Sequence, residues 1–257
     1  MKIILILFIM FEILTGQTNS DFKNRNLDHV KKFYSTFAKE AVKICLDYNI
    51  PPAAVLAIAG LESGFGSGYV ARITGNILSL GAKKGEIALP PITVPMRISD
   101  GTVFLDSSFI QKVPREDIVY KRGAPSLKKD YRPDYLAGKG DSLDYFKRHR
   151  DKYKQAKLKN IEDFCKFWIV DSSSSEVFKK ARFWADSIVV KKGKEFLLTR
   201  EASMEFIDLI GGRPHSFNYR ETWPKKVKSI IKSVGLAHLS KEIYLSGSTF
   251  ESAWRKR

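Results

Sequence analysis

The sequence predicts a mainly α fold of the α+β type, with a small β lobe, and three stretches carry that prediction. Between residues 28 and 48, apolar side chains recur every three or four positions, which is typical of an amphipathic helix. Residues 53–61 contain no polar side chain, so a helix there would be buried on every side. Residues 86–113 change in character, because prolines and β-branched residues become frequent.

The boundaries of the first two helices follow from local signals. Asp28 is a suitable cap for the first helix. Pro51 and Pro52 end that helix and begin the second, since proline is tolerated in a first helical turn. Gly64 can adopt the left-handed conformation that often follows a helix end, so we expect the second helix to stop at Glu62 or Ser63.

The β lobe is expected to contain one hairpin. Asp100-Gly101 lies between the extended segments 92–94 and 102–105, and Asp-Gly in that context is typical of a two-residue turn. Residues 114–140 are rich in proline, glycine and charge, so we expect loop there. Further helices are expected at 143–153, 174–190, 200–210 and 224–234. With no internal repeat or long linker, one domain is the simplest organisation.

The composition restricts the class of protein. The chain has 257 residues, of which 44% are hydrophobic, and this is enough for a core. Its 44 Lys and Arg against 28 Asp and Glu give a net charge of +16. Two cysteines exclude a disulfide-dense scaffold and a four-thiolate metal site, and four scattered histidines predict no metal centre. The positive charge predicts an anionic partner: nucleic acid, a membrane surface or an acidic cell-wall polymer.

The N-terminus favours the cell wall among these partners. Lys2 precedes an apolar run over residues 3–11, and Thr18-Asn19-Ser20 offers small residues at the two positions that a signal peptidase recognises. We therefore expect a signal peptide over residues 1–20, export to the periplasm or cell surface, and a mature chain starting near Asp21. The run is shorter than the roughly 20 residues of a membrane-spanning helix. We expect no membrane span in the mature chain and no nucleic-acid partner; an uncleaved anchor and a buried N-terminal element are the alternatives.

Cys45 and Cys165 each lie in an apolar-periodic segment. In an oxidising compartment they could form a disulfide, and two separately buried thiols are the alternative.

Glu62 is the candidate catalytic residue. It shares a helical face with Val55, Ile58 and Ala59, which predicts a desolvated carboxyl, and it lies near the negative end of the helix dipole. Both effects would raise its pKa toward that of a general acid working near neutral pH. The alternative is a structural ion pair with an arginine such as Arg72.

Two neighbouring stretches resemble a known family. PAAVLAIAGLESGFGS at residues 52–67, followed by GNILSLG at 75–81, is similar to the bacterial glucosaminidase family, glycoside hydrolase family 73. Residues 167–172 resemble the Phe-Arg-x-Tyr-x-Ser strand end of that family, with Val170 in place of the tyrosine. Residues 219–231 resemble its closing tyrosine motif and last helix.

The resemblance implies a lysozyme-like helical domain over residues 28–240, with a small β lobe forming a cleft, an insertion around 107–159, and a short basic tail at 241–257. It implies an endo-β-N-acetylglucosaminidase that cleaves peptidoglycan glycan strands without a metal or cofactor. Glu62 would be the acid and Asp100, or Asp106, the second carboxylate, although neither matches the family position cleanly. The residues expected to contact substrate are Phe65, Tyr219 and Trp223, by stacking on sugars, and Asn76, by bonding an acetamido group. A lytic transglycosylase and a non-catalytic envelope-binding protein are the alternative functions.

Overall fold

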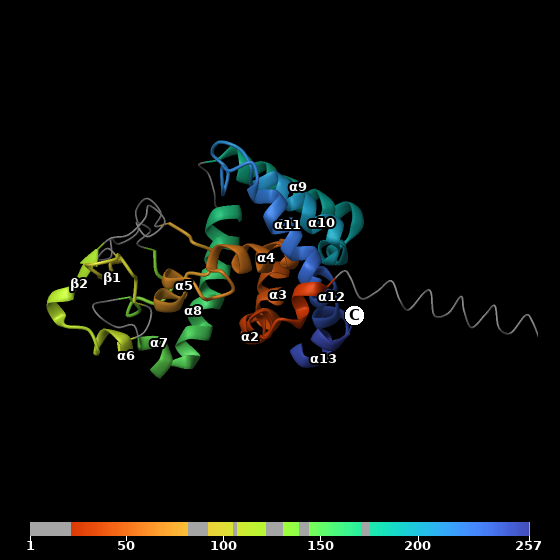
Figure 1. Cartoon of the computed structure of the whole chain (residues 1–257). Helices are drawn as coiled ribbons and strands as arrows, with labels where there is room; N and C mark the ends of the chain where they lie inside the picture. Colours follow the sequence, from red (N-terminus) through yellow and green to blue (C-terminus); the bar gives the residue numbers. More distant parts are fainter. Residues whose placement is uncertain are drawn as a thin grey trace, which may run out of the picture. The chain divides into compact units, whose positions relative to one another are not determined.

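Helices make up most of the protein, and a single antiparallel pair of strands is its only sheet in the described residues (Figure 1). This computed structural model describes residues 22–81, 92–104, 107–121, 131–138, 144–170 and 175–256. The prediction of a mainly α fold with a small β element is confirmed. The expected signal peptide at residues 1–20 and the alternative carboxylate Asp106 lie outside the described residues.

The chain divides into two compact units. Residues 1–57 and 172–257 belong to unit 1, and residues 58–171 belong to unit 2. Helix α4 (Pro52–Ser63) begins in unit 1 and ends in unit 2. The other elements of unit 1 are η1 (Lys23–Asn26), α2 (Asp28–Ser35), α3 (Ala38–Asp47), α9 (Glu176–Lys192), η5 (Lys194–Leu198), α10 (Arg200–Ile210), α11 (Trp223–Val234), α12 (Leu236–Leu245) and α13 (Phe250–Arg255).

The helix expected over residues 28–48 is interrupted. Helix α2 ends at Ser35 and α3 begins at Ala38. Thr36 Oγ1 donates a hydrogen bond to the carbonyl oxygen of Phe33 at 3.0 Å, a local bond that competes with continuation of the helix. The ring of Phe37 at this break is fully buried.

Helix α4 has the all-round burial that its apolar sequence predicts. Every residue from Ala53 to Ala59 is 0% exposed. Within unit 1, the hydroxyl of Tyr34 donates to the carbonyl oxygen of Leu56 at 3.1 Å. Burial raises the pKa of this tyrosine, so it stays a neutral donor.

The C-terminal residues, expected to form a short basic tail, are part of unit 1. Phe250 and Trp254 of α13 are buried. The side chain of Arg25, itself 3% exposed, donates to the carbonyl oxygens of Val234 at 3.0 Å and Lys256 at 2.5 Å. These oxygens lie at the ends of α11 and α13, where carbonyls lack partners inside the helix. Arg25 therefore joins the N-terminal end of unit 1 to two helix ends that lie 209 and 231 residues later in the sequence.

Unit 2 contains the sheet and a long helix. Its elements are α5 (Tyr69–Thr74), β1 (Val94–Arg97), α6 (Ser107–Ile110), η2 (Arg115–Asp117), β2 (Ile118–Lys121), α7 (Tyr145–Arg148), α8 (Arg150–Asp163) and the wide helical turns η4 (Phe164–Val170). The helix expected over 143–153 is thus two helices separated at His149. Residues 167–170, expected at a strand end, are helical and continue α8.

The partner of β1 differs from the one that the hairpin signal predicts. Strand β1 pairs with β2, from Val94 opposite Lys121 to Arg97 opposite Ile118, and β2 lies in the stretch expected to be loop. The expected partner segment contributes only an isolated bridge between Met96 and Val103. The chain does reverse direction here, but over the four residues 98–101 and not over two, because Arg97 N–H donates to the carbonyl oxygen of Thr102 at 2.8 Å and Gly101 N–H donates to that of Arg97 at 2.9 Å.

The stretch expected to be an insertion contains part of the framework of unit 2. A Cβ atom placed on Gly75, at the end of α5, would lie 2.5 Å from the Cβ of Ala156 in α8. The loop that follows α5 is therefore in close contact with α8. Cys45 and Cys165 are both buried and form no disulfide with each other, which favours the second of the two interpretations of the cysteines. In the described part of the chain, no helix is both long and apolar enough to cross a membrane.

Candidate active site

Glu62 lies in the last turn of α4, and its neighbour Ser63 shapes the chain reversal that follows. The hydroxyl of Ser63 donates to the carbonyl oxygen of Ala59 at 2.5 Å and accepts from the N–H of Gly66 at 2.9 Å. The carbonyl oxygen of Ser63 accepts from the N–H of Gly68 at 2.9 Å. These bonds satisfy groups at a helix end that would otherwise lack partners.

Three successive residues of this turn have left-handed backbone conformations. The φ angles of Gly64, Phe65 and Gly66 are +55°, +52° and +78°. Glycine adopts this region without penalty, but a bulky residue such as phenylalanine is strained there. The hydrogen bonds around Phe65 therefore hold its backbone in a conformation that phenylalanine does not itself favour. Backbone strain of this kind is found preferentially at functional sites.

The environment of Glu62 is less enclosed than the sequence predicts. Glu62 and Phe65 are both partly buried. Glu62 therefore retains part of its exposure to solvent. A partly exposed glutamate three residues before a partly exposed aromatic residue is a combination that can bind a sugar and exchange a proton with a glycosidic oxygen.

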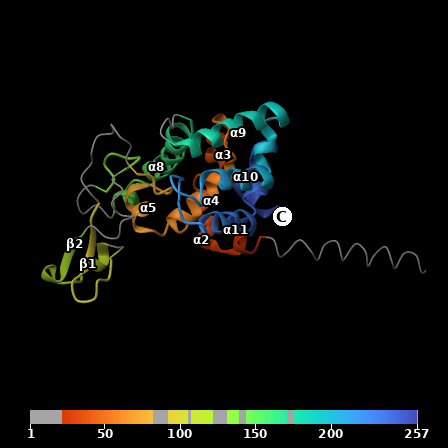
Figure 2. The same cartoon turned by 90° about the horizontal axis from the view of Figure 1, so that it is seen from above.

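Asp100 lies on the exposed turn after β1. Its Oδ1 accepts from the N–H of Thr102 at 3.0 Å, and its Oδ2 accepts from Nη1 of Arg97 at 3.0 Å. The Thr102 N–H, together with Arg97, lowers the pKa of this carboxyl, so Asp100 is a carboxylate at neutral pH. Helix α5 lies between α4 and the sheet in both views (Figures 1 and 2), which separates this turn from the end of α4.

Asn76 is buried inside unit 2, at 1% exposure. Its Nδ2 donates to the carbonyl oxygen of Leu80 at 2.8 Å, and its Oδ1 accepts from the N–H of Leu80 at 2.9 Å. Its Oδ1 also accepts from Nδ2 of Asn160 at 3.0 Å. The amide expected to bond an acetamido group is thus occupied by protein groups and closes the loop between residues 76 and 80.

The two aromatic residues expected near the C-terminal motif have opposite environments, and both belong to unit 1. Tyr219 is 69% exposed. Trp223 is 3% exposed, and a Cβ atom on Gly211 would lie 2.2 Å from its ring. Trp223 therefore packs inside unit 1 and has no free face for a sugar, whereas Tyr219 does.

Four of the six expected site residues belong to unit 2: Glu62, Phe65, Asn76 and Asp100. Of these four, only Glu62 and Phe65 lie in the same turn of the chain. Sequence reasoning missed Asn160, the buried partner of Asn76 in α8. The sequence around Asn160 gives no sign that this side chain is buried, because it is a polar residue in a strongly basic helix. Only its hydrogen bond to Asn76 shows its role.

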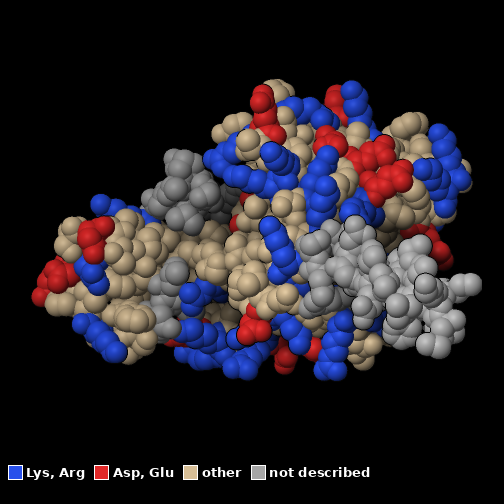
Figure 3. Space-filling view, turned by 45° about the vertical axis from the view of Figure 1, so that its right-hand side comes forward, with Lys and Arg blue, Asp and Glu red and all other residues tan. Residues whose placement is uncertain are grey.

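The described residues offer little to a metal but much to an anion. Within these ranges, no group of three or more His, Cys, Asp or Glu side chains is placed to hold a metal ion. On the face shown in Figure 3, Lys and Arg side chains are spread over most of the surface, between smaller groups of Asp and Glu.

Comparison with known proteins gives no relative: no protein-family model matches the chain, and no match is found among curated proteins or solved structures.

Proposed function

We propose that this protein is an exported peptidoglycan hydrolase that cleaves glycan strands as an endo-β-N-acetylglucosaminidase. Glu62 is the general acid that protonates the departing sugar oxygen. The observation that carries the proposal is the Glu62 turn, in which a partly buried carboxyl at a helix end is followed by a strained aromatic residue between two left-handed glycines.

The geometry of the turn supports this role in three ways. Glu62 is only partly buried, which leaves room for contact with a bound glycan. The ring of Phe65 is partly exposed and can contact the apolar face of a sugar. The hydrogen bonds of Ser63 fix the backbone on both sides of Glu62, which limits the freedom of the acid relative to a bound strand.

The proposal includes a lysozyme-like arrangement of the catalytic helix and a cell-envelope location. The basic surface of the chain supports a polyanionic substrate, since peptidoglycan carries carboxylates. Tyr219 is available as an aromatic surface for sugar binding, while Asn76 and Trp223 serve packing.

Mass spectrometry of fragments released from purified sacculi tests the proposal. Glucosaminidase activity gives fragments whose reducing end is N-acetylglucosamine. Fragments ending in 1,6-anhydro-N-acetylmuramic acid would instead identify a lytic transglycosylase. Co-sedimentation with sacculi without release of any fragment would identify a non-catalytic envelope-binding protein.

A further inference from the structure

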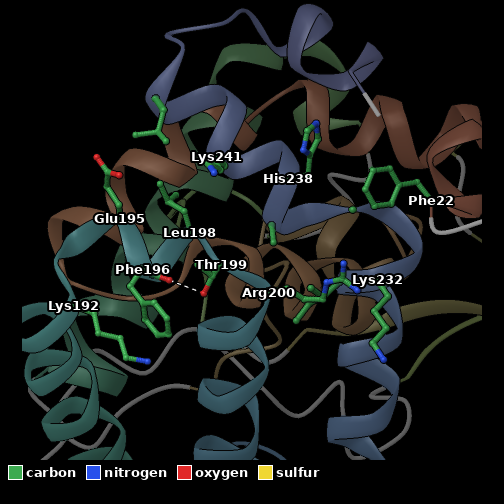
Figure 4. Close-up of a pocket in the computed structure, with 14 residues that line it drawn as sticks. Phe22, Lys192, Glu195, Phe196, Leu198, Thr199, Arg200, Lys232, His238 and Lys241 are labelled. Atoms are coloured by element: carbon green, nitrogen blue, oxygen red, sulfur yellow. Dashed lines mark hydrogen bonds between the residues drawn. The ribbon is translucent and has the colours of Figure 1, made fainter. Parts of the chain in front are cut away.

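Unit 1 contains a pocket that the proposed glycan hydrolysis does not use. It has a volume of about 470 Å³ and is lined by residues of α9, η5, α10, α11 and α12, together with Phe22 (Figure 4). That volume is within the roughly 300–1,000 Å³ typical of small-molecule sites. Its walls combine two kinds of surface, and each indicates a part of the ligand.

The first kind of surface is cationic. Lys192, Arg200, Lys232 and Lys241 line the pocket, against one carboxylate, Glu195. Lys192 lies over the ring of Phe196 and 3.6 Å from Glu201. In the described part of the chain, the side chains of the other three cations form neither a hydrogen bond nor a salt bridge. Three unpaired cations around one pocket favour an anion.

Two helix ends add to this positive field. Helices α10 and α12 both begin at the pocket, and the N-cap of α12 is Gly235, which has no side chain to accept its first N–H groups. Such groups attract negative charge. The wall therefore offers the N–H groups of a helix end as well as unpaired charge.

The second kind of surface is apolar and is contributed by Phe22, Phe196, Leu198 and Ile231. Figure 4 shows Arg200 and Lys232 on one side of the pocket and Phe196 on the other. A small inorganic anion would leave this apolar wall uncovered. A hydrocarbon chain attached to the anion would cover it.

We propose that this pocket binds a single-chain anionic amphiphile, with its head group at Arg200 and Lys232 and its hydrocarbon chain along Phe196 and Leu198. A fatty-acid carboxylate and a lipid phosphate share this chemistry. The ligand is held in unit 1, whereas Glu62 belongs to unit 2, so loss of this binding and loss of glycan hydrolysis are separate results.

Isothermal titration calorimetry of the full chain tests the proposal with dodecanoate, dodecyl phosphate, octanoate, inorganic phosphate and neutral dodecyl maltoside, each below its micelle-forming concentration. We expect one-to-one binding of both dodecyl anions. Octanoate is expected to bind more weakly, by up to about fourfold for each missing methylene that contacts the apolar wall. The tighter of the two dodecyl anions identifies the source as a fatty acid or a lipid phosphate.

A pair of matched variants locates the head group. Arg200→Gln with Lys232→Gln should weaken dodecyl phosphate binding by about tenfold or more, because two charge-assisted contacts are lost. Lys225→Gln with Lys226→Gln removes the same charge from exposed positions of α11 outside the pocket and should change the affinity less than twofold. Circular dichroism checks that both variants remain folded. Equal losses in the two variants, equally tight binding of dodecyl maltoside, or inorganic phosphate binding as tightly as dodecyl phosphate would each overturn the proposal.

Discussion

Asn160 and Asn76 join two segments of unit 2 that are 84 residues apart in sequence. Nδ2 of Asn160 donates to Oδ1 of Asn76 at 3.0 Å, and Oδ1 of Asn160 accepts from the backbone N–H of Leu78 at 2.9 Å. Both side chains are buried, so each bond replaces one that water would otherwise supply. The pair holds the loop after α5 against α8.

Replacing Asn76 with alanine should destabilise unit 2 by about 2–4 kcal/mol, because it leaves the buried N–H and carbonyl of Leu80 and the amide of Asn160 without their partner. Hydrogen exchange with mass spectrometry, which resolves the two units, should show faster exchange confined to residues 58–171. The double variant Asn76→Ala, Asn160→Ala should cost less than the sum of the single changes. Strict additivity would mean that the two amides do not act as a pair.

Part of this architecture is predictable from local signals. Helix α10 spans the residues expected, since Thr199 caps it through a hydrogen bond to Ala202 N–H and Gly211 follows its end. The buried helix α4 is predictable because an apolar run of that length has no exposed face. In both cases the information lies within a few residues of the element.

The remaining features depend on contacts between distant residues. Strand β2 has only four residues in a charged stretch, and its pairing with β1 gives it its conformation. The burial of Trp223 depends on the missing side chain of Gly211, and that of Asn160 on Asn76. At the candidate site, the position of Glu62 at a helix end was predictable, but the strain at Phe65 and the internal role of Asn76 were not.

Gly75→Ala should destabilise unit 2 by more than about 2 kcal/mol for two separable reasons. Gly75 has a φ of +74°, and an added Cβ would lie 2.5 Å from the Cβ of Ala156. Adding Ala156→Gly removes the clash but not the backbone strain, so it should recover only part of the loss. Gly81→Ala meets no atom within 4 Å and should stay within about 0.5 kcal/mol of wild type in urea unfolding. Full recovery in the double variant would mean that the conformation at position 75 costs nothing.

Lys157 should make stability rise with pH. Burial lowers the pKa of this lysine to about 8, and its Nζ lies 4.3 Å from the centroid of the Tyr153 ring. In the unfolded chain the pKa is about 10.4. Between these values the unfolded state binds more protons than the folded state, so the free energy of unfolding increases with pH across that window.

Lys157→Met should remove this contribution and, at pH 7, stabilise the protein by about 1–3 kcal/mol. Urea unfolding of both proteins from pH 7 to 10.5 measures it, since the other titrating groups are common to both. The difference between the curves should shrink as pH rises through 8. A variant that is less stable than wild type at every pH would show that the charged amine is stabilised in place.

Glu62→Gln should abolish hydrolysis of sacculi while leaving the unfolding curve nearly unchanged. The amide has nearly the same shape but cannot donate the catalytic proton, and loss of general acid catalysis typically costs about 10²–10⁴-fold in rate. Glu116→Gln, at an exposed position of the same unit, is the matched control and should retain full activity. Release of labelled fragments per folded molecule is the measurement. Unfolding of Glu62→Gln with unchanged activity per folded molecule would make Glu62 a structural ion-pair residue, with Arg72 as the first partner to test.

The reaction should proceed with assistance from the N-acetyl group of the substrate and without a protein nucleophile. A retaining enzyme with a protein nucleophile needs two carboxyl groups about 5–5.5 Å apart, and an inverting one about 6.5–9.5 Å. Asp100 is instead bound to Arg97 and Thr102 on an exposed turn, and α5 lies between that region and α4 (Figures 1 and 2). Asp100→Asn should therefore leave the rate within about twofold of wild type.

Proton NMR of the first-formed reducing end distinguishes the two routes. Participation of the acetamido group retains the anomeric configuration, because two inversions occur in sequence. Direct attack by a water molecule held by Asp100 inverts it, since there is only one displacement. A product of inverted configuration that disappears with Asp100→Asn would establish Asp100 as the catalytic base and exclude assistance by the substrate. A 1,6-anhydro end would show that the sugar's own 6-hydroxyl, and not water, attacks the anomeric carbon after Glu62 has protonated the departing oxygen.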